Sequence, residues 1–202
     1  MRVLFVSPHP DDFIMCAGGA LLKHKDAGDE IGLILVSECE HLERNAGIRE
    51  ETDALINVME LDEVDRLDVE NMIMWTPENR VRVRRVLEHW RKEWNPDIVY
   101  CPWMEDVHQD HETIAAEVFR MFRYATILQW GHPHSCIGFP ADYYVAFDTD
   151  TAYRKIGLLN IFKSQGGTPY FDLGYVERLM RSAGDEVMVP YAERFKVRRI
   201  VT

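Results

Sequence analysis

Residues 2–12 of the chain read Arg-Val-Leu-Phe-Val-Ser-Pro-His-Pro-Asp-Asp. Residues 2–7 are predicted to be a strand, since their apolar run at 3–6 is typical of a strand buried on both faces of a parallel sheet. Residues 13–27 then read as a helix that ends at Gly28, since glycine commonly follows the last turn of a helix. The stretch therefore predicts a strand and a helix joined by a turn that carries a histidine and two aspartates.

The same alternation continues downstream. Further strands are predicted at residues 31–36, 64–69 and 97–101. Helices are predicted in the later part of residues 38–61, from Thr76 until just before Pro96, and over about 108–124, with Thr76 as an N-cap and Pro77 in the first helical position. Parallel strands joined by helices imply a Rossmann-like, doubly wound α/β fold whose mainly parallel sheet has helices on both faces.

The last third of the chain is less regular. We expect a strand at residues 141–147, helices at 150–163 and 172–181, and an extended run at 194–201. Neither an internal repeat nor a linker divides the sequence. The chain is therefore predicted to be a single domain over residues 1–202.

Composition narrows the classes of partner. The chain has 202 residues, 47% of them hydrophobic, and its 34 acidic against 23 basic residues give a net charge of -11. Such an acidic balance opposes broad binding to nucleic acid or anionic lipid, so a small molecule is the expected partner, and a homo-oligomer is compatible with the sequence. The first apolar run is too short for a signal peptide, and no apolar window approaches the about 18 residues of a membrane span. We expect a cytoplasmic protein without a transmembrane segment, whose four cysteines are reduced thiols.

Two polar clusters follow predicted strands. The first is Pro8-His9-Pro10-Asp11-Asp12, and the second is Asp106-Val107-His108-Gln109-Asp110-His111, after the strand at 97–101. In open α/β sheets ligands bind beyond the carboxyl ends of the strands. If the two strands are neighbours, the clusters face each other at the point where the strand order reverses.

The residue types favour a catalytic zinc ion. Such sites commonly have three imidazole or carboxylate ligands and an open position for water, and His9, Asp12 and His111 supply that set for one zinc ion per chain. Asp11 is then left to take a proton from the water, and His108 to meet charge on the opposite side of a substrate carbonyl. Asp110 can orient one of the imidazoles.

Structural alternatives exist for each cluster. An HxxH pair by itself is a weak signal, and two successive aspartates are common at the start of a helix, where they cap it or stabilise its dipole. The combination of both clusters, each at the tip of a predicted strand, favours the metal site.

These residues resemble the PIG-L/LmbE-like deacetylases, a family marked by PHPDD near the N-terminus and by a later HxDH. Residues 8–12 match the first motif in full, and residues 108–111 match the second, with Gln109 in place of the usual proline. Phe13 replaces the glutamate that commonly follows the aspartates. Further similarity at Gly18-Gly19, Ser164-Gln165 and residues 191–195 extends the resemblance along the chain. It implies zinc on His9, Asp12 and His111, Asp11 as the general base, and His108 as the electrophilic or acidic partner.

Three residues are candidates for substrate contact. The resemblance suggests Arg49 as a substrate-binding arginine, although a solvated helical arginine is an equal alternative. Trp103, between a strand and the second cluster, is placed to stack on a sugar. His134 lies in the His132-Pro133-His134 loop, which is either a substrate rim or an ordinary polar loop.

The expected activity is zinc-dependent hydrolysis that removes an N-acetyl group from an amino sugar or sugar conjugate. One alternative is a zinc-dependent hydratase of an unsaturated dicarboxylate, whose substrate needs cationic anchors such as Arg44, Arg49, Arg154 or Lys155. A second alternative is a metal-bearing sugar-binding protein without turnover. The presence of Asp11 speaks against it, because a pure binding protein has no use for a general base.

Overall fold

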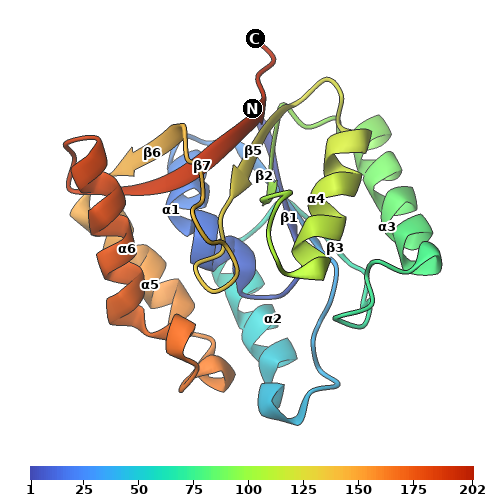
Figure 1. Ribbon diagram of the computed structural model, residues 1–202, viewed down its shortest axis with the longest axis horizontal. Coiled ribbons are helices and arrows are strands. Elements are labelled where there is room, and N and C mark those ends of the chain that lie inside the picture. The colour runs from blue at the N-terminus through green and yellow to red at the C-terminus, as the bar shows by residue number, and fades with distance from the viewer.

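Seven strands form one twisted sheet in the computed structural model, which describes residues 1–202 apart from the side chains of Arg44 and Pro169 (Figure 1). The strands are β1 (Arg2–Ser7), β2 (Glu30–Leu35), β3 (Glu63–Arg66), β4 (Ile98–Pro102), β5 (Thr126–Trp130), β6 (Tyr143–Phe147) and β7 (Tyr191–Arg199). Their order is β3-β2-β1-β4-β5-β7-β6. The first five are parallel, and β7 is antiparallel to β5 and β6. The mainly parallel sheet predicted from the sequence is confirmed.

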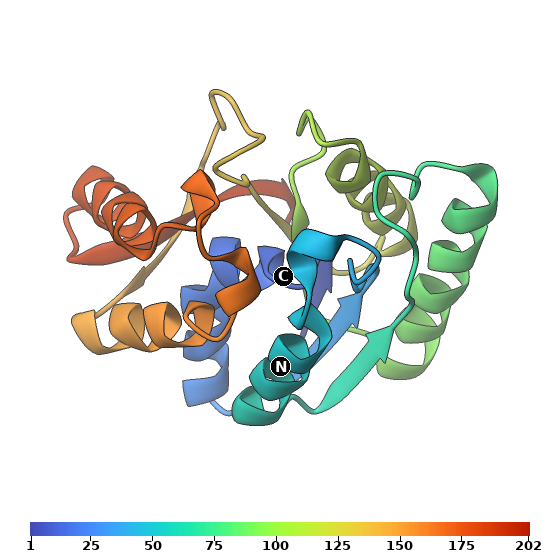
Figure 2. The same ribbon diagram turned by 90° about the horizontal axis from the view of Figure 1, so that it is seen from below.

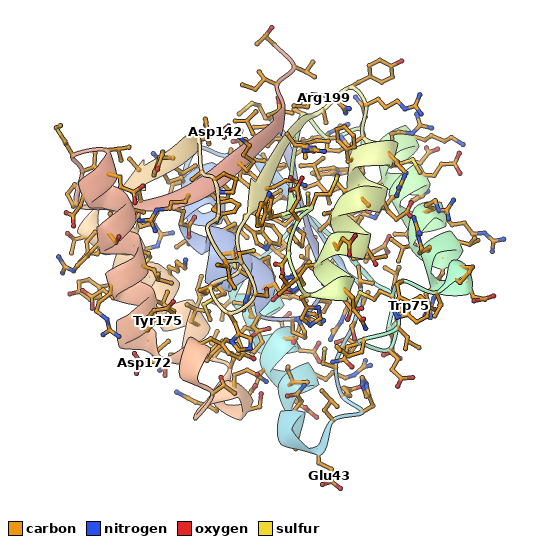
Figure 3. The ribbon with its side chains drawn as sticks, in the orientation of Figure 1. Glu43, Trp75, Asp142, Asp172, Tyr175 and Arg199 are labelled. Atoms are coloured by element: carbon orange, nitrogen blue, oxygen red, sulfur yellow. The ribbon has the colours of Figure 1, made fainter. Side chains whose placement is uncertain are left out.

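Six α-helices cover the two faces of the sheet (Figures 1 and 2). They are α1 (Asp12–Asp26), α2 (Ile48–Met59), α3 (Pro77–His89), α4 (Gln109–Met121), α5 (Thr149–Leu159) and α6 (Leu173–Glu186). Because successive side chains of a strand point to opposite faces, Val3 and Phe5 enter one core with α1, whereas Leu4 and Val6 enter the other with α3 and α4. Side chains fill both layers between sheet and helices (Figure 3). Helices on both faces define the doubly wound arrangement.

One strand was not predicted. β5 follows α4 after only a few residues, without the glycine or proline that marks most turns, so the sequence pattern there continues the preceding apolar helix. A second predicted strand is shorter than expected. It was predicted over residues 64–69 but spans only Glu63–Arg66, and Asp68 beyond it has a left-handed φ of 51°. The addition of β5 matters for function because the loop that follows it reaches the candidate site.

A close helix–strand approach explains the paired glycines of α1. A Cβ atom added at Gly19 would lie 2.4 Å from Cε1 of Phe147 in β6, so only glycine fits against this ring. Nearby, Ala17 departs from helical geometry with φ -138° and ψ 18°. The kink and the glycines together let α1 lie against β6 while its first turn stays at the carboxyl edge of β1.

A buried ion pair supports the same kink. The Glu193 carboxylate of β7 accepts hydrogen bonds from the backbone N–H groups of Gly19 and Ala20 at 2.7 and 2.8 Å. Lys155 donates to Glu193 and to the carbonyl oxygen of Met15, both at 2.7 Å. Buried backbone groups need such partners, and these two side chains satisfy groups where the regular helix is interrupted.

The chain crossing between β1 and β4 fixes the location of the two polar clusters. β1 pairs in parallel with β2 on one side and with β4 on the other, so the strand order reverses at β1. Both clusters therefore lie at the same edge of the sheet, the edge seen in Figure 2. The juxtaposition expected from the sequence is confirmed. None of the helices in the described part of the chain has the length and apolar character needed to cross a membrane.

Candidate metal centre

Three side-chain atoms from the two clusters form a small triangle. His9 Nδ1 lies 3.0 Å from Asp12 Oδ2, His111 Nε2 lies 3.2 Å from the same oxygen, and the two nitrogens are 3.4 Å apart. Ligand atoms placed tetrahedrally around zinc at about 2.0–2.1 Å are roughly 3.3 Å from one another. The spacing of these three atoms therefore fits a single zinc-sized ion.

Two outer carboxylates determine which imidazole nitrogens face that triangle. Asp106 Oδ2 lies 2.8 Å from His111 Nδ1, and Asp110 Oδ2 lies 3.3 Å from His9 Nε2. An ionised carboxylate can only accept a hydrogen bond, so these ring nitrogens carry the hydrogen atoms. Once they lose the protons on the ring nitrogens next to Asp12, His9 Nδ1 and His111 Nε2 offer lone pairs to a metal ion. This is the usual way in which ligand histidines are oriented, and Asp110, predicted to orient an imidazole, lies beside His9.

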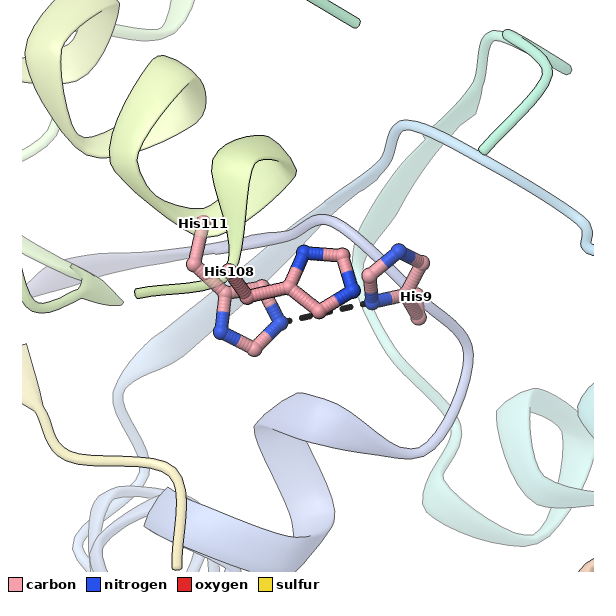
Figure 4. Close-up of side chains that lie close together, drawn as sticks. All are labelled: His9, His108 and His111. Carbon is pink, nitrogen blue, oxygen red and sulfur yellow. Dashed lines mark hydrogen bonds between the residues drawn. The ribbon is translucent and has the colours of Figure 1, made fainter. Parts of the chain in front are cut away.

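His108 lies beside the two other histidines, and the metal-binding atoms of His9, His108 and His111 are all within 4.8 Å of one another (Figure 4). Its ring stacks on His111 with the centroids 4.5 Å apart. Its Nδ1 accepts the backbone N–H of Asp110 at 3.2 Å and so caps the first turn of α4. In the neutral ring the hydrogen atom is consequently on Nε2. The cluster suits a metal ion, and its third ligand is either Asp12 or His108.

The charges of the site are strongly coupled. Burial opposes the charged ring of His111, but the nearby Asp12 and Asp106 carboxylates outweigh it and raise the pKa of His111 to about 9. Burial likewise acts against ionised Asp12, yet His111 and His9 hold the pKa of Asp12 well below its usual range. Burial, followed by repulsion from His111 and His9, lowers the pKa of His108 to about 4. The ionised Asp12 and the two imidazoles can bind a cation when the cation displaces the imidazole protons.

Asp11 is next to Asp12 in sequence but has different surroundings. It occupies the N-cap position of α1, but its side chain makes no capping hydrogen bond. Burial and then the neighbouring Asp12 carboxylate raise the pKa of Asp11 to about 7. The helix-cap alternative therefore does not account for this side chain, and a carboxyl group poised near neutral pH is suited to proton transfer.

A cavity of about 230 Å³ opens beside the triangle. The described residues that line it include the metal candidates, Asp11 and several further polar side chains: Asn45, Asn71, His134, Ser135, Gln165, Thr168 and Tyr170. No lysine or arginine is among the described lining residues. The cavity is thus suited to a ligand that offers hydroxyl and amide groups. A larger cavity of about 380 Å³ lies between α6, β7 and the loop after β5, and His132 lines both.

Two loops distant in sequence join at the rim of the cavity of about 230 Å³ beside the triangle. Gln165 Nε2 donates to Asn45 Oδ1 at 3.1 Å, and Asn45 Nδ2 donates to the carbonyl oxygen of Cys39 at 3.0 Å. Behind them, Ser164 donates through its backbone N–H and its hydroxyl to Glu51 at 2.8 and 2.6 Å. The buried amides are therefore held in fixed positions around the opening.

The three predicted substrate residues lie in different places. His134 lines the cavity and its ring contacts Tyr170 with centroids 4.9 Å apart. Arg49 instead pairs with Glu40 at 2.7 Å on the surface. Trp103 packs edge-to-face on Phe139 with centroids 5.6 Å apart, and neither Trp103 nor Arg49 is among the described cavity residues.

Two residues near the triangle have no role predicted from the sequence. Asp106 belongs to the second cluster, and its position five residues before His111 is the sequence signal for it. His132 is buried, and its Nε2 lies 3.6 Å from Asp12 Oδ1. Its approach depends on β5, which was not predicted, so the sequence pattern offered no reason to choose it over His134.

The fold and the histidine cluster define an LmbE-like α/β protein with a candidate metal site. The family model described as PIG-L: GlcNAc-PI de-N-acetylase matches residues 4–122, which is more than half of the chain. The chain therefore belongs to the PIG-L family, the family that its motifs at residues 8–12 and 108–111 resemble.

Solved structures share the fold over nearly the whole chain. The conserved protein TT1542 from Thermus thermophilus is 21% identical, with a TM-score of 0.82 and coverage of 99% of this chain and 95% of its own. The N,N'-diacetylchitobiose deacetylase from Pyrococcus horikoshii is 18% identical, with a TM-score of 0.78 and coverage of 97% and 83%. GalB, the 4-carboxy-2-hydroxymuconate hydratase from Pseudomonas putida, is 17% identical, with a TM-score of 0.78 and coverage of 100% and 97%. At these identities the likeness concerns the fold.

Proposed function

We propose that the chain is a zinc-dependent hydrolase that removes an N-acetyl group from an amino sugar or sugar conjugate. The observation that carries this proposal is the triangle of His9, Asp12 and His111 with Asp11 beside it in one cavity. Membership of a family described as a de-N-acetylase supports the same reaction. The described lining of the cavity contains no lysine or arginine, which favours a sugar over an anionic substrate.

The proposed ligands are His9 Nδ1, Asp12 Oδ2 and His111 Nε2. Bound there, zinc would polarise the acetyl carbonyl and lower the pKa of a water molecule. Asp11 accepts the proton of that water on its carboxylate as the water attacks the carbonyl carbon. His108 donates a hydrogen bond from its Nε2–H to the developing oxyanion, and Asp11 passes the proton taken from the water to the departing amine. The products are acetate and a free amino group.

The hydratase alternative requires cations that bind two carboxylates. Arg49 pairs with Glu40, Arg154 with Asp26 and Lys155 with Glu193. The side chain of Arg44 lies outside the described residues. Three of the four anchors considered from the sequence are therefore engaged by carboxylates, and this favours the deacetylase.

The test is acetate release by the zinc-loaded protein from a panel of N-acetylsugars, including N-acetylglucosamine, N,N'-diacetylchitobiose and alkyl N-acetylglucosaminides. Zinc-free protein and the corresponding amino sugars serve as controls. We expect acetate with at least one substrate. Hydration of an unsaturated dicarboxylate without acetate release would establish the alternative enzyme, and sugar binding without turnover would establish the binding protein.

A separate experiment tests the ligands. Wild-type protein is expected to hold about one zinc per chain. His9→Ala, Asp12→Ala and His111→Ala should each lose most of it, whereas His108→Ala should keep it, and His89→Ala in α3 is the matched control. Retention of zinc by Asp12→Ala together with its loss from His108→Ala would assign the metal to the three histidines instead.

A further inference from the structure

His132 is held between the metal candidates and the far wall of the cavity. It follows β5 and is only 6% exposed. Its ring meets His111 edge-to-face with centroids 5.5 Å apart, and it meets Tyr170 in the same way at 5.6 Å. A buried imidazole packed on both sides has little freedom to rotate, so the direction of its nitrogens is fixed by the fold.

The hydrogen atom of this ring is assigned by its neighbour in the loop. The backbone N–H of His134 donates to His132 Nδ1 at 3.3 Å. Because Nδ1 is the acceptor, neutral His132 carries its hydrogen atom on Nε2. That nitrogen is the one that lies 3.6 Å from Asp12 Oδ1, within electrostatic range although longer than a hydrogen bond.

The two oxygens of Asp12 have different surroundings. Oδ2 faces His9 Nδ1 and His111 Nε2 and accepts the backbone N–H of His9 at 3.0 Å. Oδ1 faces His132 Nε2. A carboxylate whose second oxygen is not held can rotate and change which oxygen it offers to a metal, so a donor at Oδ1 would fix the orientation of the whole group.

We infer that His132 is a positioning residue: its Nε2–H faces Asp12 Oδ1 and keeps Asp12 Oδ2 in the triangle with His9 and His111. The inference rests on the proposed zinc site, but it does not depend on which substrate the protein hydrolyses. It assigns His132 a part in metal affinity and geometry through Asp12, without direct contact to the ion.

The test uses three substitutions that differ in the atom placed near Asp12. Gln puts an amide N–H close to the position of histidine Nε2, Asn puts one closer to Nδ1, and Leu has no donor. We expect His132→Leu and His132→Asn to lose about 10–100-fold in zinc affinity, the usual effect of removing an outer partner of a ligand, while His132→Gln stays within about threefold of wild type. Affinity is measured by competition with a chromophoric chelator, and His134→Leu in the same loop is the control for zinc affinity.

Cobalt-substituted protein provides a readout that reports on coordination and not on turnover. The visible absorption bands should shift in His132→Leu and His132→Asn and return in His132→Gln. Circular dichroism checks folding, and if the leucine variant does not fold, the Asn and Gln pair decides. Wild-type affinity and spectrum in His132→Asn would overturn the inference, as would failure of Gln to restore them. Loss of zinc from His132→Gln as complete as from His111→Ala would make His132 a ligand. Because none of these measurements uses a substrate, they stay informative if no deacetylase activity is found.

Discussion

Asp106 Oδ2 lies 2.8 Å from His111 Nδ1, and its other oxygen accepts the backbone N–H of His108 at 2.8 Å. One carboxylate thus orients a proposed ligand and fixes the turn that carries the proposed oxyanion donor. Asp106→Asn is expected to lower zinc affinity by about 10–100-fold, because the amide is a weaker partner for the Nδ1–H of His111. Chelator competition measures this. Glu105→Gln, next to it and exposed, is the control, and equal affinity in both variants would contradict the assignment.

Asp11 and Asp12 are adjacent in sequence but should respond differently to the same change. Asp11→Asn is expected to retain near-full zinc while kcat falls by about 10² to 10⁴, the usual contribution of a positioned general base. Zinc content and turnover are measured on the same preparation, with the exposed Asp185→Asn as control. The assignment of Asp11 as general base and Asp12 as zinc ligand is wrong if Asp11→Asn loses its zinc, or if it keeps its zinc and is fully active.

Zinc binding should be coupled to proton release. The pKa of His111 is raised to about 9 in the zinc-free protein, against the effect of burial, by the Asp12 and Asp106 carboxylates. The ring therefore holds a proton at neutral pH that zinc must displace, and affinity should fall as the pH decreases from about 9. Calorimetry in buffers of different ionisation enthalpy would detect the released protons. A pH-independent affinity with no proton release would be inconsistent with this charge state.

The contact between Gly19 and Phe147 predicts a stability difference between two glycines. Gly19→Ala should destabilise the fold by about 1–3 kcal/mol, since the new methyl group overlaps a buried ring. Gly157→Ala is the control: it lies within α5 with nothing within 4 Å of an added Cβ, and it should stabilise by roughly 0.4–1 kcal/mol. Urea denaturation measures both. Combining Gly19→Ala with Phe147→Leu should cost less than the sum of the two changes, and strict additivity would show that the ring is not the obstacle.

Much of the fold follows from local patterns. The apolar run of β1, the helix after it and the cap at Thr76 depend on neighbouring residues, so the sequence predicted them, and the Thr76 side chain does accept the Asn79 N–H. The two motifs also identified the candidate metal cluster, because their chemistry and their position after strands are both local features. β5 was missed since its boundary with α4 carries no turn residue.

Local sequence patterns are enough to predict a doubly wound fold with two polar clusters that follow its strands. Which side chains meet at that edge of the sheet depends on the tertiary structure. Asp106, Asp110 and His132 reach the triangle because β1, β4 and β5 lie side by side, whereas Arg49 pairs with Glu40 and is not among the described cavity residues. Residue spacing along the chain shows which side chains follow the same strand. The distances between side chains from different strands depend on the order and packing of the strands, which no local pattern encodes.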